Sequence, residues 1–389
     1  MKSFGTLLVE GWRFVPHSYA IVNQFQCQQF LQEPNLALRH RDLPYFSPRW
    51  PKTTGLFDAK FENAIHEIPG PVAGETPDAV LRISVPYNLS PSIGKRTVVF
   101  GTAEFRCVPD FYMAGNRSLA DACRSSDALI VTPSQWSRDG FIHSGADPDR
   151  VFVVPHGIDV SIFHPLAPAE RAALRPLGGE DQFVFLTLGA MTVNKGMGLL
   201  LKAFAVVAEK HAHARLILKG LGALYESRKF LQNEINLLTQ AEINRIRPKM
   251  KFIDRVLSFA DIAKLYHLAD VYISPYSAEA FNMPVLEAIA SGLPVICTRG
   301  GSTDDFTTDD FALRVNSARF APRDIPGVNG FALRIDFNHL VHQMMVALES
   351  PRLAEKARTA GPAFVAAGHT WRHVTQKLLR VLFDADRFD

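Results

Sequence analysis

Glu279-Ala280-Phe281-Asn282-Met283-Pro284-Val285-Leu286-Glu287 is the most informative stretch of this 389-residue chain. The apolar run 270–275 before it predicts a buried parallel strand, and residues 288–292 after it predict the rest of a short helix that a glycine ends. Pro284 suits the first helical turn, where its missing N–H would have no partner, and Asn282 suits the N-cap. A strand, a loop and a helix start in this order direct backbone N–H groups toward an anion.

Strand-like and helix-like segments alternate along the whole chain, which predicts an α/β protein with parallel sheets. The expected strands are 4–9, 80–85, 97–101, 128–132, 151–155, 183–188, 215–219, 252–255 and 270–275. The expected helices are 18–32, 134–143, 197–210, 225–246, 259–268, 336–348 and 370–383, with Ser18 and Ser134 as N-caps. Residues 39–78 are Pro-rich and weakly periodic, and the Ala-, Pro- and Gly-rich stretch 166–181 predicts a linker.

The composition is that of an ordinary globular protein, because 47% of the residues are hydrophobic and 21% are charged. A chain of 389 residues is long for a single hydrophobic core and suits two domains. The net charge is only +3, and the first half of the chain is not set aside as a basic region. We therefore expect no nucleic-acid partner.

The four cysteines, Cys27, Cys107, Cys123 and Cys297, are far apart, and no Cys-x-x-Cys pair occurs. This pattern favours buried free thiols in a reducing compartment over disulfides or a zinc site. The apolar run at the N-terminus is too short for a signal peptide, and no run reaches the roughly 20 residues that span a bilayer. We therefore expect a cytoplasmic protein, and peripheral contact with the inner face of a membrane is compatible with this expectation.

Glu279 and Glu287 belong to a longer motif. Pro-Val-Leu precedes Glu287, and Ala-x-Ala-x-Gly-Leu-Pro-Val follows it. With this motif, the segment 270–294 resembles the donor-site signature of the GT-B retaining glycosyltransferases of family 4. Two glutamates at this spacing would alone fit the solvated edge of a helix, but the whole motif is far more specific.

The resemblance implies a GT-B fold, in which two Rossmann-like domains with parallel sheets face each other across a cleft. It places an acceptor domain at residues 1–168 and a nucleotide-sugar donor domain at residues 180–365. It also implies that a C-terminal helix within residues 370–389 crosses back to the N-terminal domain. The segment His156-Gly157-Ile158-Asp159 resembles the junction between the two domains of such enzymes.

The resemblance also assigns the donor site. It places Glu279 by the donor sugar and Glu287 on the ribose of the nucleotide. Lys195-Gly196 stands after a predicted strand and at a helix start, where a cation and free N–H groups suit a diphosphate, so Lys195 and Glu279 are catalytic candidates. The implied donor-binding residues are Lys195, Gly196, Glu279, Phe281, Asn282, Met283, Pro284, Val285, Glu287 and, from the first loop of the N-terminal domain, Gly11.

On the acceptor side the candidates are His17 and Glu104. Thr102-Ala103-Glu104 follows a predicted strand, and Thr-x-Glu followed by a proline resembles one subgroup of the family. Glu104 is therefore a third catalytic candidate, near the acceptor hydroxyl. The alternative for Glu104 is a salt bridge with Arg106 or with a neighbouring loop. The alternative for His17 is a structural hydrogen bond at the start of a helix.

Two departures from the family pattern affect the expected donor. An arginine usually lies a few residues before the lysine, on the diphosphate, but Ala190 occupies that position here. The candidates to compensate for it are Thr192, Asn194 and Arg255. Ala280 and Asn282 stand where glycines are common, so their side chains would narrow the approach to the sugar. The donor is therefore expected to differ from the commonest ones.

The expected activity is transfer of a hexose from a nucleoside diphosphate sugar, with retention, to a glycan, a lipid-linked or a small-molecule acceptor in surface polysaccharide or glycoconjugate biosynthesis. No Asp-x-Asp metal motif is expected at the donor site, so we expect no essential metal ion and no cofactor besides the nucleotide-sugar substrate. One alternative is a nucleotide-sugar 2-epimerase of similar architecture. The other is a non-catalytic nucleotide-sugar binding protein, which Ala190 motivates. The sequence does not name the sugar, the nucleotide, the acceptor or the oligomeric state.

Overall fold

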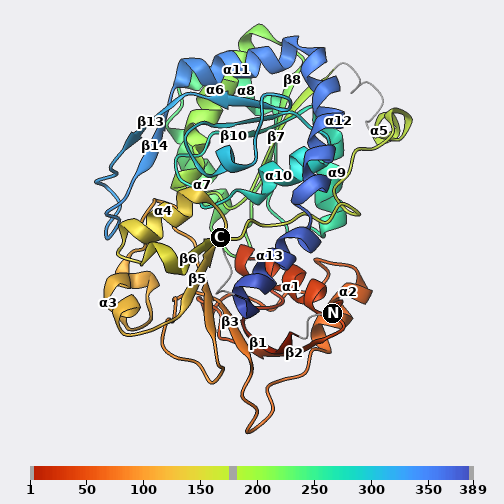
Figure 1. Cartoon of the computed structure of the whole chain (residues 1–389). Helices are drawn as coiled ribbons and strands as arrows, with labels where there is room; N and C mark the ends of the chain where they lie inside the picture. Colours follow the sequence, from red (N-terminus) through yellow and green to blue (C-terminus); the bar gives the residue numbers. More distant parts are fainter. Residues whose placement is uncertain (1–3, 175–181, 385–389) are drawn as a thin grey trace. The chain divides into compact units, whose positions relative to one another are not determined.

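The computed structural model describes residues 4–174 and 182–384 and divides the chain into two compact units (Figure 1). Unit 1 comprises Met1–Gly157, Ala321–Phe331 and His369–Asp389, and unit 2 comprises Ile158–Phe320 and Ala332–Gly368. The first boundary between the two units lies at residue 157, earlier than the predicted boundary. The internal segment 321–331 belongs to unit 1, which holds the N-terminus.

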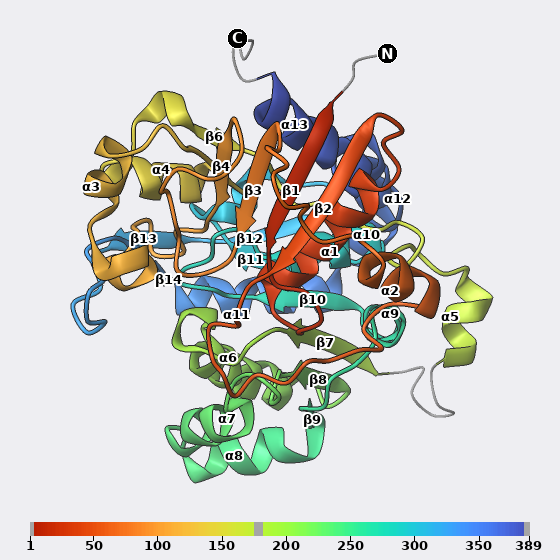
Figure 2. The ribbon, with the colours of Figure 1, turned by 90° about the horizontal axis from the view of Figure 1, so that it is seen from below.

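The sheet of unit 1 has six parallel strands in the order β2-β1-β3-β4-β5-β6. The strands are β1 (Gly5–Gly11), β2 (Leu36–Asp42), β3 (Ala79–Ile83), β4 (Thr97–Phe100), β5 (Leu129–Thr132) and β6 (Val151–Val153). The longer helices of this unit are α1 (Ser18–Phe30), α2 (Ala59–His66), α3 (Leu119–Arg124), α4 (Gln135–His143) and α13 (Trp371–Phe383). Figure 2 shows β1, β2 and β3 side by side.

The sheet of unit 2 also has six parallel strands, in the order β12-β11-β10-β7-β8-β9. They are β7 (Phe183–Leu188), β8 (Ala214–Lys219), β9 (Met250–Ile253), β10 (Val271–Ser274), β11 (Val295–Thr298) and β12 (Ala312–Val315), and an antiparallel pair, β13 (Ser317–Phe320) and β14 (Ala332–Ile335), stands apart. The helices are α5 (Pro168–Leu174), α6 (Met197–Lys210), α7 (Ser227–Asn236), α8 (Gln240–Ile246), α9 (Phe259–Leu268), α10 (Met283–Ala290), α11 (Phe337–Glu349) and α12 (Pro351–Gly368). The prediction of an α/β fold with parallel sheets is confirmed.

Both sheets reverse their strand order once. In unit 2 the chain forms β7, β8 and β9 in one direction and then returns to the other side of β7 to form β10, β11 and β12. β7 and β10 are therefore neighbours at the reversal. In unit 1 the corresponding neighbours are β1 and β3. In open α/β sheets, ligands bind beyond the carboxyl ends of the strands at such a point.

The core of unit 2 explains why its segments fold as they do. Helices α6, α8 and α11 lie on one face of the sheet (Figure 1). The apolar side of α6, which includes Leu200, Leu201 and Phe204, is buried against β7 and β8. The four residues of β10, Val-Tyr-Ile-Ser, are all buried, as expected for a parallel strand covered on both faces. α10 ends in a Schellman motif, in which the Gly292 N–H donates to Ile289 O and the Leu293 N–H to Ala288 O, both at 3.0 Å.

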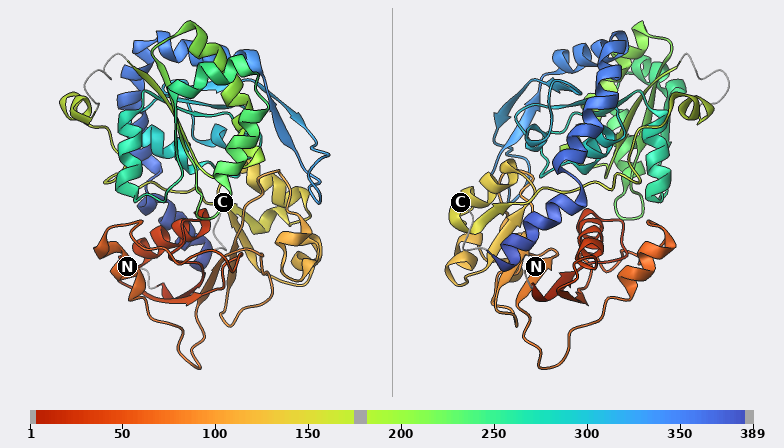
Figure 3. Two further views of the ribbon diagram at one scale, coloured as in Figure 1. Left: turned by 180° about the vertical axis from the view of Figure 1, so that it is seen from behind. Right: turned by 45° about the vertical axis from the view of Figure 1, so that its right-hand side comes forward.

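The C-terminal helix α13 belongs to unit 1, as predicted. It contacts α1, β3 and β4, and α1 and α13 lie side by side in Figure 3. The Trp371 ring stacks on the Phe25 ring of α1 at 4.9 Å, and Thr370 caps the helix by accepting from the His373 N–H. The Arg96 guanidinium donates to Leu382 O near the end of the helix.

Two predictions of local structure, the Ser18 N-cap and the single helix over 225–246, were wrong. The N-cap of α1 is His17 and not Ser18, which is the first helical residue. The helix expected over 225–246 is broken into α7 and α8, because Thr239 starts a second helix with a capping box. Residues 39–78 contain the end of β2 and all of α2. The predicted linker contains α5, and its residues 175–181 lie outside the described part of the chain.

The four cysteines all lie in the described residues, are buried and form no disulfide, as predicted. Among the helices that the structure describes, none combines the length and the apolar character needed to cross a membrane.

Candidate functional site

Lys195 and Glu279 meet where the strand order of unit 2 reverses. Lys195 ends a 3-10 turn, Val193–Lys195, in the loop after β7, and Glu279 lies in the loop after β10. Their side chains form an ion pair between Lys195 Nζ and Glu279 Oε1, although the residues are 84 positions apart in the sequence. The Glu279 side chain is 6% exposed and the Lys195 side chain 25%, so the cation is the more accessible partner.

Asn194 ties these two loops together. Its backbone oxygen accepts from the Ser277 N–H at 2.7 Å and from the Ser277 hydroxyl at 3.2 Å. Its side-chain amide donates to Ala278 O at 2.8 Å, and the Thr192 hydroxyl donates to its Oδ1 at 2.7 Å. Because Asn194 is buried, these bonds fix the loop of the cation against the loop of the carboxylate with little competition from water.

Gly196 allows the start of α6 to approach the end of β10. It has φ 68° and ψ 27°, a left-handed conformation that side chains disfavour. A Cβ atom at this position would lie 1.9 Å from the carbonyl oxygen of Pro275. The structure therefore gives the predicted donor-site glycine a backbone role that no other residue can fill.

The helices behind the two loops begin without side-chain caps. α4, α9 and α11 each start with a side chain that accepts a first-turn N–H. Gly196 before α6 and Asn282 before α10 make no such bond. The first-turn N–H groups of α6 therefore suit another acceptor. In α10, Pro284 has no N–H and the Val285 N–H donates to Asn282 O at 3.0 Å, so this helix offers an anion mainly the positive end of its dipole.

Asn282 occupies the N-cap position, as predicted, but it does not cap the helix with its side chain. It has φ 76° and ψ 64°, a left-handed conformation that asparagine tolerates better than most residues. Its amide donates to Ser274 Oγ at 2.9 Å instead. The side chain thus holds the loop against the end of β10.

The remaining donor candidates lie on the same loop and the first turn of α10. Phe281 and Val285 are buried, and the Phe281 ring lies 4.7 Å from the Phe306 ring. Met283 and Pro284 are partly exposed. The side chains of Phe281 and Val285 therefore serve the core, and these two residues can offer a ligand only their backbone.

Glu287 is a buried carboxyl group on α10. The Tyr266 hydroxyl of α9 donates to its Oε2 at 2.7 Å and also lies 3.1 Å from Pro284 O. Burial raises the pKa of Glu287 to about 7, and the hydrogen bond from Tyr266 opposes that rise. Burial likewise raises the pKa of Tyr266 well above its usual value. The Glu287 carboxyl therefore titrates near neutral pH.

Lys219, a buried lysine on β8, pairs through its backbone with the end of β7, just before Ala190. The Gly189 N–H donates to Lys219 O at 3.0 Å, which continues the pairing of β7 with β8. Lys219 is 5% exposed, and its ammonium group donates to Gly220 O. Burial lowers the pKa of Lys219 to about 8, and the charge of Asp254 opposes this effect.

In unit 1, Gly11 ends β1 next to β3. A Cβ atom on Gly11 would lie 2.6 Å from Ile83 Cγ2 and 2.8 Å from Ile83 O. Glycine is therefore required for β1 and β3 to approach each other at the reversal of strand order. This packing role is the one that the structure assigns to Gly11.

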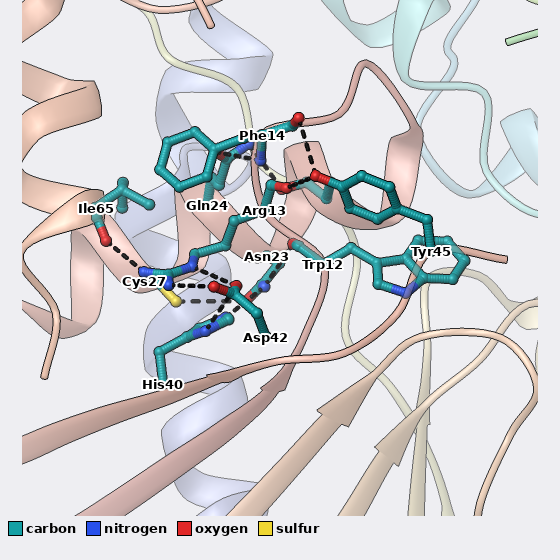
Figure 4. A network of polar contacts seen from close by, with 11 residues as sticks. Trp12, Arg13, Phe14, Asn23, Gln24, Cys27, His40, Asp42, Tyr45 and Ile65 are labelled. Atoms are coloured by element: carbon teal, nitrogen blue, oxygen red, sulfur yellow. Dashed lines mark hydrogen bonds and ion pairs between the residues drawn. The ribbon is translucent and has the colours of Figure 1, made fainter. Parts of the chain in front are cut away.

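A polar network holds the loop after β1 (Figure 4). The Arg13 guanidinium donates to both carboxylate oxygens of Asp42 at 2.8 and 2.7 Å and to Ile65 O at 2.6 Å. The Asn23 amide donates to Trp12 O at 2.8 Å and lies 2.9 Å from His40 Nε2. Burial and, secondly, the charge of Arg13 lower the pKa of His40 to about 3, so this ring is neutral and accepts from Asn23.

His17 starts α1 at the end of this loop. Its Nδ1 accepts from the Tyr19 N–H at 3.2 Å, so the ring proton is on Nε2. Burial lowers the pKa of His17 to about 4, which leaves the ring neutral at physiological pH. The hydrogen bond expected under the structural alternative for His17 is present, and the residue is partly exposed.

Glu104 is exposed in the loop after β4. Thr102, two residues earlier, joins a buried hydroxyl group network. The Tyr19 and Tyr87 hydroxyls lie 2.7 Å apart, and Tyr19 also lies 3.1 Å from Thr102 Oγ1. The Arg106 guanidinium pairs with Asp139 and lies over the Trp136 ring. The structure thus places the Glu104 carboxylate at the carboxyl end of the sheet of unit 1.

Within residues 4–174 and 182–384, no group of three or more His, Cys, Asp or Glu side chains is arranged to hold a metal ion. The groups with which these residues could hold an anionic ligand are the Lys195 ammonium and the helix starts of α6 and α10.

Comparison with known proteins agrees with this arrangement. The family described as glycosyl transferases group 1 matches residues 182–329, which include both Lys195 and Glu279. Residues 182–329 are therefore similar in sequence to the group 1 glycosyl transferases. The fold of the chain is GT-B, since the structure of Anabaena HepE in complex with UDP and glucose superposes with a TM-score of 0.68 at 15% identity, covering 97% of this chain and 99% of that one.

Curated relatives match over shorter segments. The mannosylfructose-phosphate synthase of Agrobacterium fabrum is 28% identical over 67% of this chain and 53% of its own length. The D-inositol 3-phosphate glycosyltransferase of Pseudarthrobacter chlorophenolicus is 31% identical over 44% of this chain and 40% of its own length. The chain therefore spans about half the length of the curated relatives that it matches.

The segment 182–329 brings together most of the predicted donor residues, but sequence reasoning missed two that support them. Tyr266 binds Glu287 from the preceding helix, and no local pattern marks it. Asn194 was considered only as a replacement for the missing arginine, whereas the structure uses it to join the loops. Gly11, His17 and Glu104 lie in unit 1.

Proposed function

We propose that the chain is a retaining glycosyltransferase that moves a hexose from a nucleoside diphosphate sugar to an acceptor. The observation that carries the proposal is the Lys195–Glu279 ion pair, which lies at the reversal of strand order within the segment that is similar to group 1 glycosyl transferases. In this proposal unit 2 binds the donor and unit 1 binds the acceptor.

The chemistry follows from where charge develops. The bond between the anomeric carbon and the diphosphate breaks, and negative charge gathers on the leaving diphosphate. Lys195 offers a cation to that charge, the uncapped first turn of α6 offers N–H groups, and α10 offers the positive end of its dipole. The acceptor oxygen bonds to the anomeric carbon on the face that the diphosphate leaves, and the leaving phosphate takes the acceptor proton.

The remaining roles are proposals of the same kind. Glu279 lies by the donor sugar, Glu287 holds the ribose, and Glu104 faces the acceptor hydroxyl. Thr102-Ala103-Glu104 supports membership of the Thr-x-Glu subgroup of the family. The solved Anabaena protein holds UDP-glucose, so UDP-glucose is the first donor to test.

The test is a panel of nucleotide sugars, namely UDP-glucose, UDP-N-acetylglucosamine, GDP-mannose and ADP-glucose, screened by thermal shift and then by turnover. A donor at one hundred times its Kd should stabilise the fold by about 2.7 kcal/mol. The stabilising donor should be hydrolysed slowly without an acceptor and should give a product of retained anomeric configuration by NMR.

Other results would point to one of the alternative functions. Interconversion of two nucleotide sugars with no acceptor present would identify a 2-epimerase. Binding without transfer or hydrolysis would identify a non-catalytic binding protein, the alternative that Ala190 favours. The absence of stabilisation by any nucleotide or nucleotide sugar would refute the donor site itself.

A further inference from the structure

We propose that three aromatic rings of unit 1, His17, Phe46 and Trp50, form a platform on which a saccharide acceptor stacks. We call this set the aromatic platform. The proposal rests on the proposed function and deepens it, because it names the chemical class of the acceptor. It concerns unit 1 alone.

The aromatic platform stands beyond the carboxyl ends of two neighbouring strands. His17 lies in the loop that leaves β1, and Phe46 and Trp50 lie in the segment that leaves β2. β1 is also the strand at which the order of this sheet reverses. A ligand of an open α/β sheet is expected at this position.

The rings are stacked from the core outward. Trp12 is buried at 1% exposure and meets the Trp50 ring edge-on at 5.8 Å. The His17 ring is stacked on Trp50 at 5.0 Å with an interplanar angle of 28°, and the Phe46 ring lies 6.3 Å from Trp50. Phe46 is 53% exposed, while Trp50 and His17 are partly exposed. The stack therefore presents aromatic surface to solvent, and the buried Trp12 ring packs against it from the core side.

Hydrogen bonds between the two segments hold the platform in place. The Trp12 indole donates to Pro44 O at 2.8 Å, and the Leu43 N–H donates to Gly11 O at 3.0 Å. The Tyr45 hydroxyl donates to Arg13 O at 2.7 Å, in the network that Figure 4 shows. A surface that is ordered before binding loses less entropy when its ligand binds.

The chemistry of the platform suits a sugar ring. An aromatic ring carries negative charge on its face, and the C–H groups on one side of a pyranose carry partial positive charge. Sugars also need polar partners at their edges. The exposed Arg49 precedes Trp50 in the chain, and Asp42, whose side chain is 59% exposed and paired with Arg13, ends β2. Aromatic surface with a few polar groups beside it is the usual lining of a small-molecule site.

A lipid surface suits the platform less well. Membrane contact requires a broad apolar face with a cationic border. The exposed Arg49 and Lys52 supply cations in this segment, but Phe46 is the only member of the platform that is more than half exposed, so the broad apolar face is missing. The observations therefore favour a saccharide.

Collisional quenching of tryptophan fluorescence by acrylamide tests the proposal directly. The other three tryptophans, Trp12, Trp136 and Trp371, are at most 5% exposed, so quenching reports mainly on Trp50. The probes are methyl glycosides of glucose, mannose, galactose and N-acetylglucosamine and the disaccharides maltose and lactose, each at millimolar concentration. At least one of them should reduce quenching in the wild type and not in Trp50→Phe, whose remaining tryptophans are buried.

The same saccharide should then serve as an acceptor in the transfer assay. Trp50→Ala should raise its KM about tenfold, the loss expected for about 1.4 kcal/mol of contact, with kcat and donor hydrolysis unchanged. Phe46→Ala should raise the KM by a smaller factor, and Trp50→Phe should stay near wild type because it keeps a ring. The matched control is Ile93→Ala, which removes a side chain that is 52% exposed elsewhere in unit 1 and should change nothing.

Any of three outcomes would overturn the proposal of the aromatic platform. The first is that no probe changes the quenching of Trp50, and the second is that Trp50→Ala and Phe46→Ala both leave the acceptor KM unchanged. The third is that vesicles with 30% phosphatidylglycerol protect Trp50 from quenching when no saccharide does. Phe46→Ala keeps the test valid if Trp50→Ala fails to fold, because Phe46 lies on the exposed side of the stack. Failure of the proposed function is separate, since it would show as loss of nucleotide-sugar binding while saccharides still protect Trp50.

Discussion

The Lys195 ammonium group pairs with the Glu279 carboxylate across the loops that follow β7 and β10, the neighbouring strands at which the sheet of unit 2 reverses its order. The carboxylate is almost fully buried, whereas a quarter of the lysine side chain is exposed. A partly accessible cation is thus paired with a buried carboxylate. The contribution of this ion pair to stability and its role in binding a ligand can be measured separately.

Removing Lys195 should cost more stability than removing the charge of Glu279. Lys195→Met leaves the buried carboxylate without its ammonium partner, a loss of about 3–5 kcal/mol in the free energy of unfolding. Glu279→Gln leaves a cation that can still reach water and should cost less. The double variant Lys195→Met/Glu279→Gln should recover most of the stability, because no buried charge remains. Urea unfolding of the four proteins measures this cycle.

Donor turnover should not follow stability in this series. Each single variant and the double variant should lose about 10²–10³-fold in turnover, since the charge that meets the leaving group or its partner is gone. A double variant that is stable and also active would show that the pair serves the fold alone. A double variant as unstable as Lys195→Met would show that contacts other than the pair hold the loops.

Gly196→Ala should prevent the two loops from meeting. The new Cβ would lie 1.9 Å from Pro275 O, and the residue would be held at φ 68°. We expect a loss of at least about 3 kcal/mol in the free energy of unfolding, together with loss of nucleotide binding. The matched control is Gly368→Ala, which has open space around its Cβ position and should be close to neutral. Equal melting temperatures for both variants would contradict the role assigned to Gly196.

Sequence reasoning succeeded where one local signal fixes an element. The helix predicted over 370–383 is α13, Trp371–Phe383, with Thr370 as its N-cap ahead of an amphipathic segment. The apolar run at 270–275 could only be a strand covered on both faces, and it forms β10. Both elements are defined by residues next to each other in the chain.

Sequence reasoning failed where contacts between residues far apart in the chain determine the local structure. The Tyr266 hydroxyl reaches Glu287 across two elements, a contact that depends on how α9 and α10 pack. His17 takes the N-cap of α1 from Ser18 in a loop that the Arg13 and Asn23 side chains shape. Apolar periodicity continues from α7 into α8, so the sequence pattern does not reveal the break at Thr239.

Thr239→Ala tests whether this break is held by its capping box. The Thr239 hydroxyl accepts from the Glu242 N–H at 3.3 Å, and Glu242 Oε2 accepts from the Thr239 N–H at 2.7 Å. Loss of the cap should lower the free energy of unfolding by about 1 kcal/mol without changing turnover. Thr359→Ala, at an exposed position inside α12, is the control and should be neutral or slightly stabilising, because alanine is the better helix former. If the two variants unfold alike in urea, the capping box does not hold the start of α8.

Glu287 should make the protein less stable as the pH rises toward neutrality. Its pKa is raised from 4.5 to about 7 in the folded state, mainly by burial. Below about pH 4.5 the carboxyl is protonated in both the folded and the unfolded chain and its burial is harmless. Between about pH 4.5 and 7 the unfolded chain loses this proton while the folded chain keeps it, so stability falls with pH by up to about 3 kcal/mol. Above pH 7 both states are ionised and the effect is constant.

Glu287→Gln isolates this group from the others that titrate in the same range. The difference in the free energy of unfolding between wild type and Glu287→Gln, measured by urea unfolding at pH 4 to 8, should grow in favour of the variant as the pH rises and level off above about pH 7. Tyr266→Phe removes the hydrogen bond that lowers the pKa of Glu287, so its midpoint should move to higher pH. A difference that does not vary with pH would mean that the carboxyl keeps its ordinary pKa in the folded protein, and the buried hydrogen bond from Tyr266 would then have to compensate in full for its burial.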